Sequence, residues 1–354
     1  MTQSRSNRPL HRLALLTAVA TFPLIFMGGL VTSHGAGMSV PDWPNSYGYN
    51  MFTFPPSLWI GGIFYEHTHR LMGTAVGMLS IALAIVAWRT EPRRWIRWLA
   101  VACLFAVILQ GVLGGLRVVL VKLDLAIVHA CFAQAFFCLA ALCAVVTSKW
   151  WIEAPDLSRS AARESGRRLA AACGFAVVLI FSQLIVGAMM RHYRAGLAVP
   201  DFPLAYGQLL PSTNDPALTA INDHRAWDLN LEPVTAGQIW LHLGHRAGSV
   251  LVTLAIAAVA WIVVRWHRDQ PALLRPVMIL VVLLVIQITL GALTVLWRKP
   301  ADVASAHVAV GALTLMTAFV LTVRSARLFV RRREAVGFPI NLQPQDRPGR
   351  LAVA

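Results

Sequence analysis

The chain has 354 residues, of which 57% are hydrophobic and only 13% charged. This composition excludes an ordinary soluble domain and predicts an integral membrane protein. The formal net charge of +15 would also suit a nucleic-acid-binding protein, so the placement of the basic residues has to decide between the two.

Eight apolar stretches meet or approach the roughly 20 residues that a helix needs to cross the hydrocarbon core of a bilayer. They cover about residues 13–33, 67–88, 98–118, 125–147, 169–190, 238–264, 274–296 and 303–323. The sequence therefore predicts an all-α integral membrane protein with eight transmembrane helices. The first stretch also fits a signal peptide, but we find no convincing small-residue cleavage site after it and count it as a helix.

The basic residues give this predicted membrane protein an orientation. Most of the 31 Lys and Arg residues precede the first stretch or follow the second, fourth, sixth and eighth. The positive-inside rule makes that side cytoplasmic, so both termini are expected inside a bacterial-type cell membrane and the loops 34–65 and 191–237 outside. Basic ends of spanning helices need no further ligand, which favours contact with the lipid bilayer over nucleic acid.

The chain contains an internal repeat. Residues 36–48 (AGMSVPDWPNSYG) match residues 195–207 (AGLAVPDFPLAYG), and residues 109–116 match residues 286–293. Each half holds four predicted helices, and this even number makes both halves enter the membrane in the same direction. We expect two tandem four-helix bundles related by a pseudo-twofold axis: an N-terminal half (1–147), a cytoplasmic linker (148–168), a C-terminal half (169–325) and a cytoplasmic tail (326–354).

Four histidines recur near the outer ends of the inward-running helices, and they form one pair in each half: His69 with His129, and His245 with His307. Two imidazoles at the same depth on facing helices suit axial ligation of a haem iron from both faces. A single histidine at this depth is often only an interfacial residue, but ionisable groups repeated within spans tend to be functional. Zinc or copper would call for further ligands, and neither half repeats any.

Charged residues accompany the histidines. Arg70 and Arg246 follow His69 and His245 directly, at the outer rim, where a guanidinium suits the carboxylates of haem propionates or simply anchors its helix. Asp42 and Asp201 lie in the repeated loops, where we expect them to stabilise turns, although these loops could also cover the sites as lids.

The two halves differ at position 66. Glu66 precedes His69 by three residues, whereas the counterpart of Glu66 in the second half is His242. The i,i+3 spacing places Glu66 beside whatever His69 binds. A carboxylate there could accept a proton or stabilise a positive charge, or serve only the helix dipole. The asymmetry suggests that one site transforms a ligand while the other stores or passes electrons.

The motif EHTHR at 66–70, its counterpart HLGHR at 242–246, the later histidines and the duplicated eight-helix plan resemble the haem A synthase family. The resemblance covers nearly the whole chain up to about residue 325. It implies oxidation of a ring methyl of haem O to a formyl group, which gives haem A for cytochrome oxidase. It further implies that His69 and His129 bind the substrate haem beside a catalytic Glu66, and that His245 and His307 ligate the iron of haem b.

The resemblance also implies partners. Haem O would come from a haem O synthase, and an electron donor, which the sequence does not identify, would be required. Oligomers are common in the family, so a homo-oligomer is an open option that no motif decides. Some members carry a cysteine pair in the first outer loop, but residues 34–65 contain no cysteine.

Two other classes of protein compete with this interpretation. A dihaem cytochrome b that takes electrons from quinol is the main alternative, but vectorial transfer usually places two haems near opposite membrane faces. A transporter would also tolerate a repeat and buried polar groups. Four histidines at one depth suit a transporter less well.

Overall fold

The computed structural model describes residues 7–330, and all regular structure within that range is helical. Eight helices are long and apolar enough to cross a membrane, which confirms the predicted eight-span, multi-pass membrane fold. They are α1 (Arg8–Ser33), α2 (Gly61–Thr90), α3 (Arg94–Leu120), α4 (Leu123–Thr147), α6 (Arg163–His192), α8 (Ala236–Trp266), α9 (Pro271–Leu296) and α10 (Ala301–Phe329). The short elements are α5 (Lys149–Glu153), α7 (Asp215–Trp227) and the 3₁₀ turns η1 (Pro56–Leu58) and η2 (Ala195–Leu197).

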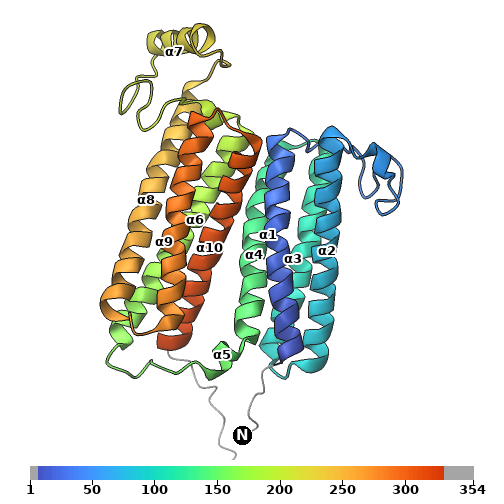
Figure 1. Ribbon diagram of the computed structural model, residues 1–354, viewed down its shortest axis with the longest axis vertical. Coiled ribbons are helices and arrows are strands. Elements are labelled where there is room, and N and C mark those ends of the chain that lie inside the picture. The colour runs from blue at the N-terminus through green and yellow to red at the C-terminus, as the bar shows by residue number, and fades with distance from the viewer. Residues whose placement is uncertain (1–6, 331–354) are drawn as a thin grey trace, which may run out of the picture.

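The long helices form two bundles side by side, α1–α4 in one and α6, α8, α9 and α10 in the other (Figure 1). Inside the bundles α1 packs on α2, α3 on α4, α6 on α8 and α9 on α10. The seam between the bundles is made by α1 and α4 against α10, and by α4 against α6. Ile25, Phe137 and Ala312 form a small buried apolar cluster across this seam.

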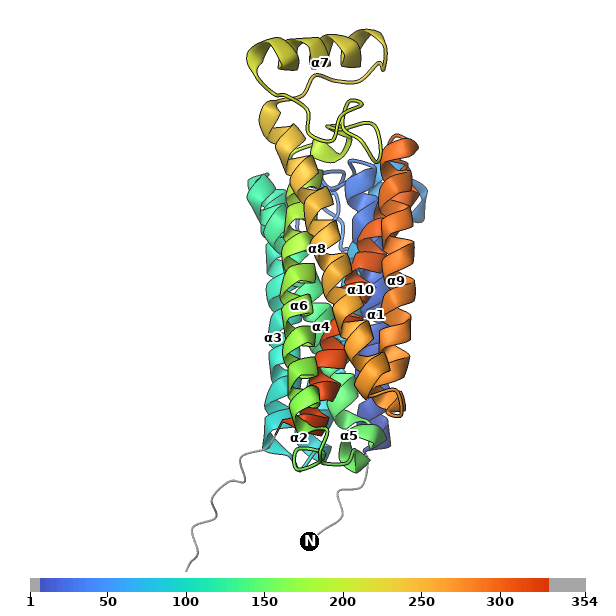
Figure 2. The same ribbon diagram turned by 90° about the vertical axis from the view of Figure 1, so that its left-hand side faces the viewer.

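The connections between helices gather at two ends of the molecule (Figures 1 and 2). The start of α1, the end of α10 and α5 lie at one end. The long loops 34–60 and 193–235, together with α7, lie at the other, which we call the loop end. The expected tail 326–354 has only its first residues described, since α10 continues to Phe329 and the residues after Val330 lie outside the described range.

Local sequence fixes where the site-bearing helix α8 begins. Thr235 is its N-cap, and its hydroxyl accepts a hydrogen bond from the Gln238 backbone N–H at 3.3 Å. The Gln238 side chain accepts the Thr235 backbone N–H at 2.9 Å, which completes a capping box. Because the helix starts at a defined residue at the loop end, His242 and His245 fall two to three turns below that start.

Candidate functional site

The structure brings the histidines together in the pairs that the repeat suggested. The ring centroids of His69 in α2 and His129 in α4 are 6.5 Å apart, with an interplanar angle of 83°. Those of His245 in α8 and His307 in α10 are 6.4 Å apart, with an angle of 71°. Both pairs lie within one bundle each, in the part of the helices nearest the loop end.

Each of these imidazoles lies against a glycine of a neighbouring helix. A Cβ built on that glycine would lie 3.0 to 3.1 Å from the Cε1 atom of the ring, which is closer than side chains normally approach. Any other residue would push the ring away, so glycine sets the ring position. The four contacts are Gly28 in α1 with His69, Gly114 in α3 with His129, Gly187 in α6 with His245 and Gly291 in α9 with His307.

Glutamine precedes three of these glycines by four residues and binds the same histidines. Gln110 donates to the backbone oxygen of His129 at 2.8 Å, and Gln183 donates to that of His245 at 2.7 Å. The Gln183 amide also lies 3.1 Å from His245 Nδ1, and the Gln287 amide lies 3.5 Å from His307 Nε2. The sequence signal for these residues is the repeated pattern Gln-x-x-x-Gly, which the sequence analysis did not use.

The first half has more open space beside its histidines than the second. Gly73 and Gly77 follow His69 by one and two helical turns, and a Cβ on either would meet no neighbouring side chain within 4 Å. Their counterparts in the second half are Ser249 and Thr253. The hydroxyls of these two residues donate to backbone oxygens of their own helix at 2.6 and 2.8 Å.

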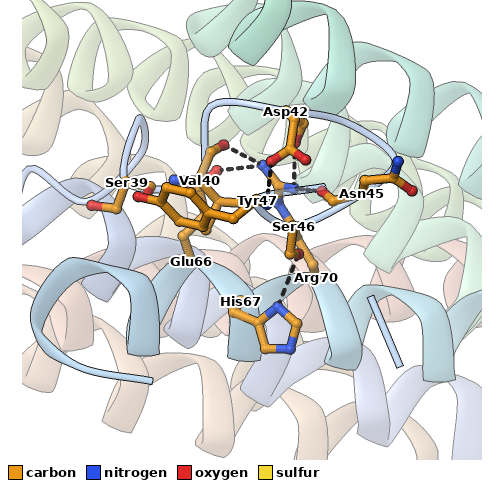
Figure 3. A network of polar contacts seen from close by, with 9 residues as sticks. All are labelled: Ser39, Val40, Asp42, Asn45, Ser46, Tyr47, Glu66, His67 and Arg70. Atoms are coloured by element: carbon orange, nitrogen blue, oxygen red, sulfur yellow. Dashed lines mark hydrogen bonds and ion pairs between the residues drawn. The ribbon is translucent and has the colours of Figure 1, made fainter. Parts of the chain in front are cut away.

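Glu66 is buried, with 4% of its surface exposed, and both of its carboxylate oxygens are engaged (Figure 3). Oε1 accepts a hydrogen bond from Arg70 Nη2 at 2.8 Å, and Oε2 accepts the Val40 backbone N–H at 3.0 Å. An arginine and a backbone N–H are the donors that suit an ionised carboxylate. Glu66 therefore links α2 to the first outer loop.

Arg70 and Arg246 are tied to the outer loops by their Nη groups. Besides Glu66, Arg70 donates to the backbone oxygens of Asp42 at 2.7 Å, Asn45 at 2.9 Å and Val40 at 2.7 Å (Figure 3). These bonds use all four N–H groups on its two Nη atoms. Arg246 repeats the arrangement with three loop oxygens, those of Val199, Asp201 and Leu204. The predicted contact with haem propionates is not tested for either arginine; in the structure all Nη donors of Arg70 are bonded, whereas the three bonds of Arg246 use one N–H of its Nη1 and both of its Nη2.

Asp42 and Asp201 stabilise turns in the two loops. Asp42 accepts the backbone N–H groups of Tyr47 at 2.7 Å and Gly48 at 2.8 Å, and Asp201 accepts those of the equivalent Tyr206 and Gly207. Partial burial opposes ionisation of Asp42, but the two backbone donors and the charge of Arg70 outweigh it and lower its pKa below 3.8.

The two histidines without an assigned role also hold the loops. His67 is fully buried, lies 3.2 Å from the Ser46 hydroxyl through Nδ1, and packs against the rings of Phe54 and Trp59. His242 Nδ1 lies 3.3 Å from the Val199 backbone nitrogen and 3.1 Å from the Ala195 oxygen. It accepts the Val199 N–H in the tautomer in which Nδ1 carries no hydrogen.

The seam between the bundles carries a buried polar contact close to both histidine pairs. Arg191 in α6 donates through Nη2 to the backbone oxygen of Gly29 at 2.5 Å and to the Ser33 hydroxyl, both in α1. Ser33 lies 2.9 Å from the hydroxyl of Ser305 in α10. Because Gly29 follows the glycine that contacts His69, this network couples the first site to the second bundle.

Each histidine pair offers two ligands to a metal. Among residues 7–330, no group of three or more His, Cys, Asp or Glu side chains gathers at one point. Two nitrogens on opposite sides suit a metal whose remaining positions are filled by a planar macrocycle, whereas protein-bound zinc needs three or four side-chain ligands.

Fold and site together define a duplicated, multi-pass membrane protein with two partly buried histidine pairs, only one of which has a carboxylate nearby. Residues 61–320 match the family model described as cytochrome oxidase assembly protein. The chain belongs to this family, and the resemblance noted in its sequence is confirmed by relatives that are named haem A synthase.

Three such relatives cover most of the chain. The haem A synthase of Geobacillus kaustophilus (strain HTA426) is 28% identical over 307 residues, which is 85% of this chain and 86% of the relative. That of Shouchella clausii (strain KSM-K16) is 28% identical over 261 residues, 73% of this chain and 84% of the relative. That of Bacillus cereus (strain AH187) is 25% identical over 299 residues, 83% of this chain and 86% of the relative.

Proposed function

We propose that this enzyme is a haem A synthase that oxidises a ring methyl of haem O to a formyl group, with His69 and His129 as ligands of the substrate haem and His245 and His307 as ligands of a resident haem b. The observation that carries the proposal is the spacing within the pairs, 6.5 and 6.4 Å between ring centroids. Two imidazole–metal bonds of about 2 Å each, together with the distance from each coordinating nitrogen to the centre of its ring, require the two ring centroids to lie roughly 6 Å apart.

The surroundings of the rings fit an iron porphyrin. The Nδ1 atoms of His69, His129 and His307 are buried and have no hydrogen-bond partner of normal geometry. Glycine contacts fix all four rings, and open space follows His69 at Gly73 and Gly77. Metal ligands are commonly held in this way by contacts behind the coordinating ring.

Two asymmetries support the first half as the substrate site. Glu66 has no acidic counterpart, since His242 occupies its position in the second half. The open positions Gly73 and Gly77 are replaced there by Ser249 and Thr253. A site that admits and releases a substrate needs additional room and a reactive group, whereas a permanently bound cofactor needs only the space that it fills.

The protein contributes orientation and charge to the reaction. Bound haem would supply the redox chemistry of its iron, with dioxygen as the oxidant of the successive oxygenation steps and an external donor for the electrons that each of these steps consumes. His69 and His129 fix the plane of the substrate. Glu66, whose carboxylate is held by Arg70 and the Val40 N–H, stabilises positive charge that develops at the methyl carbon, or takes up a proton released there. Because both of its oxygens already accept hydrogen bonds, charge stabilisation is the role we assign first.

The positions of the basic residues support a cell-membrane orientation with the loop end outside and both termini in the cytoplasm. Within the described residues, Arg8, Arg12, Arg89, Arg93 and Arg94 lie at the end opposite the loops. Haem O synthase as the source of substrate, cytochrome oxidase as the destination of the product and a homo-oligomeric state belong to the same proposal.

The experiment is to purify the protein from haem-replete cells, extract the bound haems and determine their masses. We expect haem b together with haem O, a hydroxylated form or haem A. His245→Ala should remove haem b, and His129→Ala should keep haem b but abolish haem A formation. A colourless preparation would overturn the proposal, and two b haems without any oxidised haem O would favour the dihaem cytochrome.

A further inference from the structure

Arg117 is a charged residue near the first histidine pair that has no role in the mechanism above. It lies in the last turn of α3, at the loop end, and its side chain is partly buried. Its guanidinium lies against Gly37 of the first outer loop, where a Cβ would collide with Nη2. With glycine at position 37, the first outer loop lies directly against this guanidinium.

Arg117 lies near the first site, because it follows Gly114, the glycine that contacts His129, by three residues, about one turn of α3. Glu66, the acidic residue of that site, makes no hydrogen bond to Arg117, and its carboxylate oxygens are bonded to Arg70 and to the Val40 N–H.

Within residues 7–330 Arg117 makes no hydrogen bond or ion pair. A partly buried guanidinium without a hydrogen-bonded anionic partner is unfavourable, and an anionic ligand at this place would supply one.

Comparison of the repeats shows that this cation is specific to the first half. The counterpart of Arg117 is Thr294, whose hydroxyl donates to its own helix at the Leu290 oxygen, 2.7 Å away. At another position the arginine is in the second half: Arg191 corresponds to Thr32 in the first half, whose hydroxyl donates to the Gly28 oxygen at 3.2 Å. Arg191 is bonded across the seam to α1, whereas Arg117 has no such bond.

We propose that Arg117 binds a carboxylate of the porphyrin substrate in the N-terminal site. The inference rests on the proposed function and deepens it, because it names the group that recognises the propionate edge of the substrate. Arginine matches a carboxylate with two parallel N–H donors. Arg70, the residue whose sequence position suggested this role, has its Nη donors occupied by three loop oxygens and by Glu66.

The test is a porphyrin titration of the purified protein with its second-site haem in place. Iron protoporphyrin IX and its dimethyl ester, which lacks the free carboxylates, are added separately, and binding is followed by the Soret band. The signal of the first site is the part of the Soret change that is absent when His129→Ala is titrated in the same way. We expect the wild type to prefer the free acid, and Arg117→Gln to weaken free-acid binding about tenfold, the size of one charge-assisted hydrogen bond, with little change for the diester.

Lys122→Gln is the matched control, because it removes one positive charge from an exposed residue at the same end of the molecule. It should leave the preference for the free acid unchanged. The retained second-site haem shows that a variant is folded. If Arg117→Gln loses that haem, Arg117→Met, which keeps an aliphatic side chain, is titrated with the free acid and the diester in its place.

An Arg117 variant that binds both porphyrins as the wild type does would overturn this inference and leave the proposed function intact. A wild type with no signal that depends on His129 would instead overturn the proposed function, and the inference with it. Equal affinity of the wild type for acid and diester would overturn the inference alone.

Discussion

Glu66 and His242 occupy the same position in the two repeats, and each accepts the backbone N–H of the equivalent valine in the outer loop. The valine nitrogen lies 3.0 Å from Glu66 Oε2 in the first half and 3.3 Å from His242 Nδ1 in the second. Holding the loop is therefore common to both halves, and the negative charge is specific to the first. The two contributions of Glu66 can be separated by substitution.

Glu66→His should retain the loop contact and lose the chemistry. We expect normal hydrogen-exchange protection of residues 36–48 and normal porphyrin binding, with haem A formation lowered by about 10² or more, the usual effect of removing a charge-stabilising group. Exchange measured by mass spectrometry and haem analysis give the two readouts. Glu66→Ala should lose both properties, and near wild-type haem A formation by Glu66→His would refute the catalytic assignment.

The glycine contacts predict a position-specific effect in α6. Valine at Gly187 places side-chain carbon about 3.1 Å from Cε1 of His245, so the ring has to move. We expect lower haem b occupancy and a changed Soret band, with a cost of about 1–3 kcal/mol for overpacking. The control is Gly174→Val in the same helix, where the nearest neighbour of a Cβ, Thr322, is 4.0 Å away. Equal haem loss in both variants would mean that the effect comes from helix propensity.

The first outer loop should depend on pH through Asp42. Hydrogen bonds from Tyr47 and Gly48 and the charge of Arg70 lower its pKa below 3.8. A lowered folded-state pKa stabilises the loop above pH 3.8, and this contribution is lost as the pH falls through the lowered value. Exchange of residues 42–48, corrected for the intrinsic rate, should therefore accelerate only below about pH 3.8. Asp42→Asn should exchange quickly at neutral pH and show no further acid step; an acid step that persists in this variant would exclude Asp42 as its origin.

Arg191 should stabilise the contact between the bundles. Arg191→Met removes the hydrogen bonds to Gly29 and Ser33 across the seam, while the Ser33 hydroxyl keeps its contact with Ser305. We expect a loss of about 2–3 kcal/mol, observed as a lower thermal midpoint in detergent. Arg168→Met is the control, because it removes an exposed ion pair with Glu164 in the same helix, worth at most about 1 kcal/mol. Equal midpoints for the two variants would exclude a structural role for the seam contact.

Sequence analysis predicted the spans and the histidine pairs because both depend on short-range pattern. Helix length in a bilayer follows from the number of consecutive apolar residues, and the repeat fixes which helices correspond. Positions such as His69 and His129 are then placed at one depth by counting along two helices. The structure confirms the eight spans and shows that these two rings are neighbours.

The roles of the arginines could not be obtained in the same way. Arg70 and Arg246 bind backbone oxygens of loops about 25 to 47 residues away, and backbone oxygens have no signature in a sequence. The role proposed for Arg117 concerns a site whose histidines belong to α2 and α4, so only the packing of α3 against His129 reveals it. The glycine contacts could have been predicted from the sequence, because the pattern Gln-x-x-x-Gly recurs at Gln110, Gln183 and Gln287.

Each histidine pair, with the glycines that position it, is supplied by the four long helices of one bundle. Because both halves belong to one chain, each position of the repeat can carry a different residue in each half. The halves have used this freedom at two places: Glu66 and Arg117 in the first correspond to His242 and Thr294 in the second.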